Sequence, residues 1–401
     1  MKITKIENLL IDRYLFVRIT TDSGITGIGE SGAWGFLEAS LGALETFKGY
    51  LLGQDPLRIE HHFQNMYRWS HFRGAAIMGA ISAIDIALWD IAGKHFGVPV
   101  YQLLGGKVRD KARVYCHAYG QSREQLVEAC RQAKTAGFTA IGHLTPFLDE
   151  ATNIPYYQTH VGKIEEAIEA VRLYREAVGK EVDLCIEIHR RLTPHEAVVL
   201  ARGIEQYHPM FIEDPTLPDS MDAMAAIAAK THVPIATGER LHTIFEFEML
   251  LSRNAVHYVR PDVCLCGGIT HAKKIAALAE ARHVGVVPHN PLSPVSTAAC
   301  IQIAACCPNF VLQEYPNDEG QAFGGVPPQG AEQLVGTENS LLSKRRNNLV
   351  KAPLVLEDGF IVIPDGPGIG VELVEGAEEL FPHKRRPILT RLHRDGSVVD
   401  Q

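Results

Sequence analysis

Three glutamates in the middle of the chain have the residue type and the spacing of a metal site. They are Glu187 in LCIEIH, Glu213 in MFIEDP and Glu239 in IATGER, at equal intervals (213 − 187 = 26 and 239 − 213 = 26). Each follows a short apolar run that is typical of a buried strand and precedes a helical stretch. Strand–helix units of a parallel barrel take about 30 residues and bring their strand ends to one mouth. Three converging carboxylates favour a hard divalent cation, and we expect Mg²⁺.

The same rhythm continues beyond the glutamates. Asp262 in RPDV, His289 in VPHN and Glu314 in LQEY follow at similar intervals (262 − 239 = 23, 289 − 262 = 27 and 314 − 289 = 25). An aspartate beside a histidine on a neighbouring strand end orients the imidazole and stabilises its charged form. We therefore interpret His289 as a general base that Asp262 orients.

A second histidine accompanies the first glutamate. His189 lies two residues after Glu187, and side chains two apart on a strand share a face. Both are expected to point into the mouth, with Ile188 facing the core behind them. A metal between two imidazoles suits an elimination: one removes the proton alpha to a carboxylate, and the other protonates the departing beta-hydroxyl. His189 is the predicted acid.

Composition limits the class of protein. The chain has 401 residues, 46% of them hydrophobic, which suits two domains with a large core, and a net charge of −8. Without a long basic run, nucleic acid and anionic membranes are not expected as partners. No secretory signal and no membrane span are recognisable, so we expect a cytoplasmic protein. The eight cysteines are expected to be reduced thiols, since the Cys264/Cys266 pair lacks further ligands for a soft metal.

Changes of pattern along the chain predict the architecture. Residues 1–112 open with alternating strands and continue as helices, which indicates an α+β unit. Residues 113–325 alternate between eight strand candidates and seven helices, and this favours an α/β fold with a (β/α)7β TIM-like barrel over an open sheet. Residues 326–401 are Gly/Pro-rich and then polar, and the alternating stretch 354–364 is expected to return to the N-terminal unit.

The motifs resemble those of the enolase superfamily, and more narrowly its acid-sugar dehydratases. The barrel motifs are IEIH, FIEDP, TGER, RPDVCLCGGIT, VPHNPLSP and LQEY, and SAIDIALWDIAGKHFGVPVYQLLGG is similar to the superfamily's capping domain. GGIT, PHNPLSP and the histidine of IEIH look most like D-galactonate dehydratases. FIEDP and the C-terminal ILTRLHRDGSVVDQ are also similar to mannonate dehydratases, and the E-x-H ligand motif to gluconate dehydratases.

The resemblance implies a function and a set of roles. The reaction would be dehydration of an aldonate, D-galactonate first, to a 2-keto-3-deoxy sugar acid through an enediolate. One Mg²⁺ per subunit would lie on the three glutamates, and Glu314 would hydrogen-bond the substrate. The capping domain would choose the substrate, with Trp34 in a lid loop and His71 and Arg73 in SHFRG as candidate contacts. Relatives form tetramers and octamers, so a homo-oligomer is expected.

The chain also departs from the family pattern at the first ligand and at the second barrel strand. Glu187 stands where galactonate dehydratases usually have Asp. The strand AIGHL places Gly142 and Leu144 where many relatives carry a lysine motif, and alternation predicts that His143 faces the opposite way from both. Without a lysine base, a two-base racemase is disfavoured.

Other functions stay open at this point. In the loop TPFLDEATNIPYYQTH, Tyr156 or Tyr157 is an alternative base of the mannonate dehydratase type. The same metal and base would also serve a D-gluconate or D-mannonate dehydratase, or a sugar-acid epimerase or cycloisomerase. A non-catalytic metabolite-binding or regulatory protein would be expected to lack a ligand or the Asp–His pair.

Overall fold

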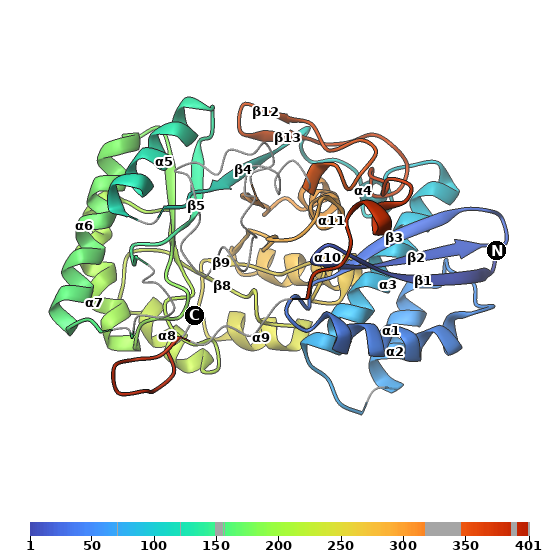
Figure 1. Cartoon of the computed structure of the whole chain (residues 1–401), viewed down its shortest axis with the longest axis horizontal. Helices are drawn as coiled ribbons and strands as arrows, with labels where there is room; N and C mark the ends of the chain where they lie inside the picture. Colours follow the sequence, from blue (N-terminus) through green and yellow to red (C-terminus); the bar gives the residue numbers. More distant parts are fainter. Residues whose placement is uncertain are drawn as a thin grey trace.

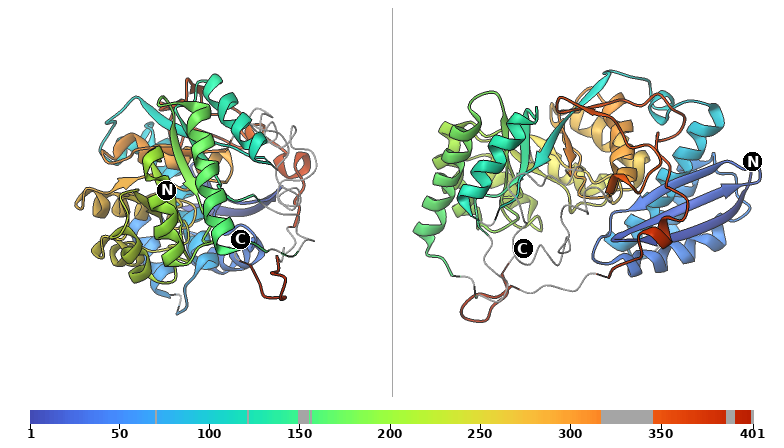
Figure 2. Two further views of the ribbon diagram at one scale, coloured as in Figure 1. Left: turned by 90° about the vertical axis from the view of Figure 1, so that its left-hand side faces the viewer. Right: turned by 45° about the horizontal axis from the view of Figure 1, so that its top comes forward.

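An antiparallel sheet covered by helices forms the N-terminal part of the protein (Figure 1). The computed structural model describes residues 1–69, 71–120, 122–148, 155, 157–316, 346–385 and 391–399. The sheet has the order β1 (Ile3–Ile11), β2 (Tyr14–Thr21) and β3 (Thr26–Ser31). Four helices follow: α1 (Leu37–Leu51), α2 (Ile59–Trp69), α3 (Ala75–Phe96) and α4 (Val100–Leu103). These elements lie at one end of the molecule in Figure 1 and in the right-hand view of Figure 2.

Helix α3 packs directly on β3. Gly27 and Gly29 make this possible, because a Cβ at either position would collide with the α3 backbone at Ala87 or Ala83. The helix is long and apolar enough to cross a membrane by composition, but 78% of its most apolar window is buried inside the protein. It therefore has the features of a core helix between the sheet and the rest of the chain.

In the part of the chain that the structure describes, eight parallel strands make the second part of the molecule. They are β4 (Lys111–His117), β5 (Ala140–Leu144), β6 (Asp183–Glu187), β7 (Phe211–Glu213), β8 (Ile235–Thr237), β9 (Tyr258–Val259), β10 (Gly285–Val286) and β11 (Gln313–Tyr315). Each pairs in parallel with the next from β4 to β10, and β11 pairs in parallel with β4. Between β10 and β11, Val286 exchanges backbone hydrogen bonds of 2.9 Å with Asn309 and Val311. The strands thus close into a barrel.

Helices connect the barrel strands in sequence order. They are α5 (Arg123–Thr135), α6 (His160–Val178), α7 (Pro194–Ile204) with the short η1 (Glu205–Tyr207), α8 (Met221–Ala228), α9 (Ile244–Ser252), α10 (Gly268–Glu280) and α11 (Pro294–Cys306). One helix element therefore lies between each pair of strands, and the predicted (β/α)7β barrel with an α+β N-terminal unit is confirmed.

Two apolar layers hold the barrel together. The inside is filled by one ring of side chains from the strands: Tyr115, Ala140, Cys185, Phe211, Ala236, Val287 and Leu312. The other faces of the strands pack against the helices in a larger core that also contains Ile188. All eight cysteines are free and buried. Apolar strands that alternate between these layers leave their polar side chains at the strand ends.

The C-terminal region touches both parts of the molecule. The hairpin β12 (Leu356–Glu357) and β13 (Phe360–Val362) pairs antiparallel with the start of β4, where its partners are Lys111, Ala112 and Arg113. These partners lie on both sides of the predicted limit at residue 112, so the return of 354–364 to the N-terminal unit stays a prediction. The contacts with that unit come later. Ile369 N–H donates to Asp90 Oδ1 at 2.9 Å, and after α14 (Ala377–Leu380) the Asp12 N–H donates to Phe381 O at 2.8 Å. The residue limits of the predicted domains stay a prediction.

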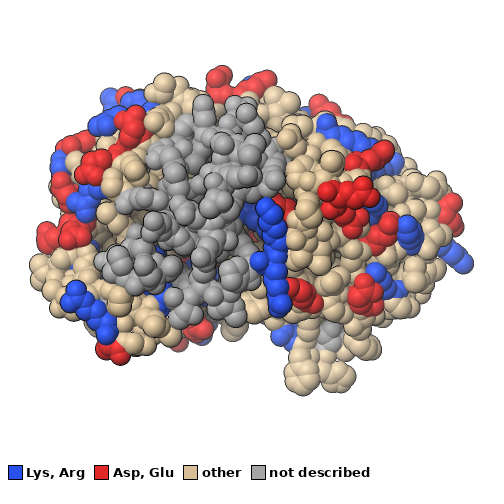
Figure 3. All heavy atoms as spheres, viewed as in Figure 1, with Lys and Arg blue, Asp and Glu red and all other residues tan. Residues whose placement is uncertain are grey.

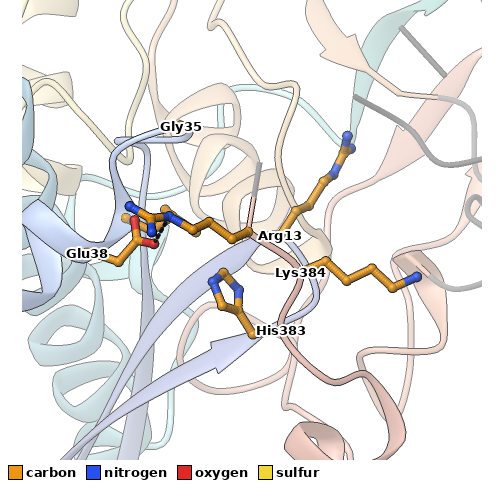
Figure 4. A pocket seen from close by; sticks show the side chains of 7 residues that line it. Arg13, Gly35, Glu38, His383 and Lys384 are labelled. Atoms are coloured by element: carbon orange, nitrogen blue, oxygen red, sulfur yellow. Dashed lines mark ion pairs between the residues drawn. The ribbon is translucent and has the colours of Figure 1, made fainter. Parts of the chain in front are cut away.

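A small surface pocket marks the last of these contacts (Figure 4). It lies between the β1–β2 turn, the loop from β3 to the start of α1 and the C-terminal segment 383–385, and an ion pair of 2.9 Å joins Arg385 Nε to Glu38 Oε1. Its lining residues are Arg13, Gly35, Leu37, Glu38, His383, Lys384 and Arg385. On the face shown in Figure 3, the described Lys/Arg and Asp/Glu side chains are interspersed rather than segregated.

Candidate metal centre and active site

The three evenly spaced glutamates meet at the mouth of the barrel. Glu187 ends β6, Glu213 ends β7, and Glu239 lies two residues after β8. Strand register places Glu187 beside Glu213, and one carboxylate oxygen from each of the three residues lies within 4.8 Å of the others. The equal spacing therefore predicted correctly that these three side chains lie together; their role as metal ligands stays a prediction.

The electrostatics of this cluster suit a cation. Burial raises the pKa of Glu187 to about 8, and the neighbouring charges of Glu239 and Asp214 add to the rise. Burial also raises the pKa of Glu213, although Arg260 opposes it. Buried carboxylates that repel one another are stabilised by a bound cation, and three oxygen donors match the preference of Mg²⁺. The residues therefore fit the predicted metal ion.

Two arginines already balance part of this negative charge. Arg190 Nη1 lies 2.9 Å from Glu239 Oε1 and 3.3 Å from Asp214 Oδ2. Arg260, only 1% exposed, pairs with Glu213 and donates to Glu314 Oε2 at 2.7 Å. Neither arginine was recognised from the sequence. Arg190 directly follows the E-x-H motif, and Arg260 lies at the end of an apolar strand.

The predicted base and its orienting aspartate form a pair. His289 Nδ1 lies 2.9 Å from Asp262 Oδ2, and the other nitrogen, Nε2, lies 3.5 Å from Glu239 Oε2. Asp262 Oδ1 accepts the Cys264 N–H at 2.8 Å, which holds the carboxylate in place. Burial lowers the pKa of His289, but the charges of Glu239, Glu314 and Asp262 outweigh it and raise the pKa to about 9. The imidazole is thus held with Nε2 toward the carboxylate cluster.

The predicted acid lies at the other end of the cluster. His189 Nε2 is 3.9 Å from Glu187 Oε1, which also accepts the His189 N–H at 2.9 Å. Ile188 is fully buried behind them, as alternation predicted. Burial and the nearby His143 lower the pKa of His189. An imidazole therefore stands on each side of the three glutamates, on strands that face each other across the barrel.

Glu314 is the hub of a hydrogen-bond network. It is 3% exposed and accepts from His117 Nε2 at 2.9 Å, from Arg260 and from the Asn290 N–H at 2.8 Å. Burial raises the pKa of Glu314, but Arg260, His289 and His117 outweigh it and hold the pKa well below the usual range. The carboxylate is therefore ionised at neutral pH. Its predicted contact with the substrate stays a prediction.

Two further histidines lie at the mouth, and one of them, His143, has an orientation different from the predicted one. His143 was expected to turn away, yet its ring centroid lies 4.9 Å from that of His189 and 4.9 Å from that of His117. The alternation is broken because His143 has a φ of +47° and the β5–β6 register shifts between Ile141 and Leu144. His117 was missed, although its spacing carried the signal: it lies 143 − 117 = 26 residues before His143.

The loop after β3 reaches the barrel at this site. Gly32 N–H donates to Cys264 O at 2.7 Å, and a Cβ on Gly32 would lie 3.1 Å from Asp262 Oδ1. Trp34 follows two residues later with 47% of its surface exposed. The base of the predicted lid loop therefore touches the residue that orients His289, and the contact of Trp34 with a substrate stays a prediction.

The remaining substrate candidates lie elsewhere on the N-terminal part. His71 and Arg73 are exposed in the loop between α2 and α3, and the Arg73 guanidinium lies 4.2 Å from the centre of the Tyr67 ring. Among the described residues, neither side chain forms a hydrogen bond or an ion pair with the carboxylate cluster. Tyr156 lies outside the described residues, and Tyr157 is 57% exposed with Arg394 stacked on its ring at 4.7 Å.

Comparison with known families matches both parts of the chain. Residues 5–105 match the mandelate racemase/muconate lactonizing enzyme N-terminal domain, and residues 125–377 match the enolase C-terminal domain-like family. A D-galactonate dehydratase from Ralstonia pickettii (strain 12J) is 38% identical over 407 residues, with all of both chains covered. Another from Verminephrobacter eiseniae (strain EF01-2) is 36% identical over its full length.

Solved structures show the same similarity. An enolase from Agrobacterium radiobacter, a candidate galactarate dehydratase bound to Na⁺ and L-malate, has a TM-score of 0.88 with 31% identity and covers 100% of both chains. A mandelate racemase/muconate lactonizing enzyme-type protein from Labrenzia alexandrii DFL-11 has a TM-score of 0.84 with 29% identity, over 98% of this chain and 100% of that one. Both similarities extend over the N-terminal unit and the barrel.

Proposed function

The chain belongs to the mandelate racemase/muconate lactonizing enzyme family of the enolase superfamily, and from that premise we propose that it is a hydro-lyase that dehydrates a sugar acid. The substrate we infer is an aldonate, with D-galactonate first, and the product a 2-keto-3-deoxy sugar acid. The observation that carries the proposal is the placement of two imidazoles, His189 and His289, on opposite sides of three carboxylates, two of them buried and one partly buried. Elimination of water needs a base and an acid in such an arrangement.

Charge balance supports a metal-assisted reaction. Glu187, Glu213 and Glu239 would hold one Mg²⁺, which, when bound, would stabilise the negative charge that develops on the substrate carboxylate. Sugar acids carry that carboxylate next to the C2 hydroxyl, so both groups suit a site of this kind. The ionised Glu314 lies across the mouth and helps to keep Arg260 and His117 fixed.

The chain's own residues supply the proton transfers. His289 Nε2 would remove the proton on C2 in its neutral form, and Asp262 would hold the resulting imidazolium through Nδ1. A cation on the glutamates would favour that neutral form, because the charge of Glu239 is the largest of those that raise the pKa of His289. His189 would donate a proton to the C3 hydroxyl, so that water leaves and an enol forms. The enol then tautomerises to the 2-keto product. Atoms balance, because the C2 proton and the C3 hydroxyl are lost together as water.

Competing reactions differ in the chemical group that they need opposite His289. An epimerase needs a second base opposite His289, and the described end of β5 offers no lysine for that role. D-mannonate or D-gluconate would use the same two imidazoles, so they differ from D-galactonate in hydroxyl contacts alone. A homo-oligomer of four or eight subunits stays a prediction from family resemblance, and a cytoplasmic location stays a prediction from the sequence pattern.

A dehydration screen tests the proposal. The purified protein with Mg²⁺ is incubated with a library of aldonates and aldarates, including D-galactonate, D-gluconate, D-mannonate and galactarate, and 2-keto-3-deoxy products are detected with semicarbazide. We expect turnover of D-galactonate that EDTA abolishes and Mg²⁺ restores. Full activity in a metal-free preparation, or no product from any acid sugar, would refute the proposal.

Two variants then separate the proton-transfer steps. His289→Asn is expected to stop both the exchange of the C2 proton with D₂O and the dehydration, because the base is lost. His189→Asn is expected to block dehydration while the exchange continues. If His189→Asn dehydrates at the wild-type rate, His189 is not the acid. If exchange survives in His289→Asn, another group is the base.

A further inference from the structure

Three imidazoles form a row along one side of the barrel mouth. His189 follows β6, His143 lies near the end of β5, and His117 ends β4. The ring centroids are 4.9 Å apart at each step, and Tyr119 lies 5.3 Å from the His143 ring. His189 and His117 have functions or partners described above, whereas His143 in the middle has no role in the proposed reaction.

The backbone of β5 is shaped to bring this side chain inward. At position 142, any Cβ would collide with the Tyr115 ring, so the chain needs glycine there. His143 has a φ of +47°, in the left-handed region that a residue other than glycine seldom adopts. Leu144 then packs in the outer core. A strained conformation that turns a polar side chain into a site is frequently associated with function.

The order of residues around the rim matches the order of carbons in a sugar acid. The carboxylate cluster lies on β6, β7 and β8, and His189 lies on the β5 side of it. In the proposed reaction, C1 and C2 lie at the cluster and the C3 hydroxyl lies at His189. A chain that continues in the same direction next reaches His143 and then His117 and Tyr119. The C4 hydroxyl is the first substituent after the reacting pair.

We propose that His143 is a specificity-determining residue that hydrogen-bonds the C4 hydroxyl of the sugar acid. The inference rests on the proposed dehydration and extends it from the reacting carbons to substrate recognition. It predicts that polyhydroxy acids with a C4 hydroxyl are preferred over analogues that lack it. His117 and Tyr119, which are joined by a hydrogen bond of 2.7 Å, lie where the following carbons would pass.

The chemistry of the side chain suits a hydroxyl group. Burial lowers the pKa of His143 to about 4, and the neighbouring His117 contributes to the fall. The imidazole is therefore neutral at pH 7, with one nitrogen that donates and one that accepts. A hydroxyl also donates and accepts, so the two can pair in either direction. A site built for such a bond discriminates against a substrate without it, because its polar group would stay unpaired.

The experiment compares D-galactonate with 4-deoxy-D-galactonate in the wild type and in His143→Ala, with Mg²⁺ present. We expect the wild type to favour D-galactonate by about 10- to 100-fold in kcat/KM, since lost hydrogen bonds to a substrate hydroxyl have effects of at least this size. In His143→Ala this ratio should fall toward 1, mostly through KM. His143→Gln, which can still donate and accept, should retain part of the preference.

Controls separate recognition from structure. His195→Ala removes an exposed histidine on α7 and should keep the wild-type ratio. Circular dichroism and calorimetric Mg²⁺ affinity verify that His143→Ala is folded with its metal site intact. If kcat/KM in that variant is unchanged, or falls by the same factor for both substrates, the wild-type ratio is kept and the proposal for His143 is wrong.

A binding measurement distinguishes failure of this inference from failure of the proposed function. His289→Asn with Mg²⁺ cannot take the C2 proton, so the affinities for D-galactonate and its 4-deoxy analogue can be measured by calorimetry without turnover. The same pair is measured in His143→Ala/His289→Asn. Discrimination that disappears only in the double variant supports His143 even if the wild type dehydrates neither acid. Equal discrimination in both variants refutes it, whatever the outcome of the dehydration screen.

Discussion

Among the described residues, one group of carboxylates lies at the barrel mouth and another lies at the junction between the N-terminal unit and the barrel; every member is buried except Glu239, which is partly buried. The mouth group is Glu187, Glu213 and Glu239, whose oxygens lie within 4.8 Å of each other. The junction group is Glu30, Asp85 and Asp90, at 0%, 1% and 0% exposure. Burial raises the pKa of Glu30 and of Asp85 to about 7 and raises that of Asp90.

The junction carboxylates are surrounded mainly by neutral donors. Glu30 on β3 accepts from the Ser293 N–H at 3.2 Å and the Ser296 N–H at 3.1 Å, at the start of α11. Asp85 on α3 accepts the Thr270 N–H at 3.0 Å in the first turn of α10. Each of these two carboxylates thus accepts hydrogen bonds from its own set of donors. Through these bonds the N-terminal unit is attached to the barrel helices α10 and α11.

Asp90 joins three segments in a similar way. It accepts the Ile28 N–H at 3.1 Å and the Ile369 N–H at 2.9 Å, and Lys94 Nζ lies 2.8 Å away. The mouth group differs because its members repel each other and have too few donors. Burial alone therefore does not identify a reactive acid. Carboxylates that crowd together at strand ends need a cation, whereas carboxylates held singly by N–H and O–H groups serve the fold.

The sharpest way to test this difference is the same substitution in each group. Glu187→Gln removes one ligand and one charge, so Mg²⁺ affinity should collapse and kcat/KM should fall by about 10³-fold or more, since a catalytic metal contributes several kcal/mol. Stability without metal should be unchanged or higher, because repulsion by Glu239 and Asp214 is relieved. Calorimetric titration with Mg²⁺, the semicarbazide assay and urea unfolding measure the three quantities.

Glu30→Gln is the matched control for that experiment. It makes the same change of atoms at a junction carboxylate, so Mg²⁺ affinity should stay within about threefold of wild type, a difference of less than 1 kcal/mol. A strong loss of metal binding in Glu30→Gln, or none in Glu187→Gln, would remove the distinction between the two groups.

A substitution of Arg260 tests how far the mouth carboxylates depend on buried arginine side chains. It is 1% exposed and pairs with Glu213 and Glu314, so Arg260→Met would leave both carboxylates short of a partner. Breaking a buried ion pair from one side costs about 3–5 kcal/mol, and we expect a loss of that size in the free energy of unfolding without metal. Added Mg²⁺ should stabilise the variant more than the wild type, because it also neutralises Glu213.

Thermal unfolding with EDTA and with Mg²⁺ measures this difference. Arg253→Met is a suitable control, since Arg253 makes a single ion pair of 2.6 Å with the exposed Asp222 on the surface. Surface pairs contribute about 0–1 kcal/mol, so this variant should lie close to wild type. If Arg260→Met also unfolds like wild type in EDTA, the buried arginine does not hold the carboxylates.

The mouth group could be predicted from sequence because regular strand–helix units repeat at a regular length. Glu187, Glu213, Asp262 and His289 all lie where that repeat placed them, since each strand ends at the same height of the barrel. His143 was missed because its position depends on one left-handed backbone conformation, which breaks alternation and leaves no mark in the hydrophobic pattern.

Other residues escaped prediction for different physical reasons. In the sequence, Arg260 is one residue at the end of a strand. Only its tertiary contacts with Glu213 and Glu314 show that it belongs to the site. Glu30 lies in ITGIGES, where alternation does not tell which donors it will meet, because Ser293 is 263 residues away in sequence. Contacts between distant segments are set by packing of whole units, and local pattern carries little information on them.

The smallest predicted effect is a pH dependence of the free energy of unfolding that comes from Glu30, a junction carboxylate. The pKa of Glu30 is raised to about 7 from an ordinary 4.5 by burial, which the donors Ser293 and Ser296 and the charge of Arg346 only partly offset. The folded state therefore holds this proton more tightly than the unfolded chain. Its contribution to stability is fully present below pH 4.5 and is lost as the pH rises through about 7.

Glu30→Gln removes this titration, so the free energy of unfolding of the wild type relative to the variant should decline between about pH 4.5 and 7, by up to about 3 kcal/mol. Urea unfolding at intervals of pH, with EDTA present, measures the slope for each protein. Glu187 has no part in this difference, because both proteins retain it. A relative stability that is flat across this window would mean that Glu30 is ionised in the folded protein throughout, and that the junction carboxylates are held as anions, as those at the mouth would be by a metal.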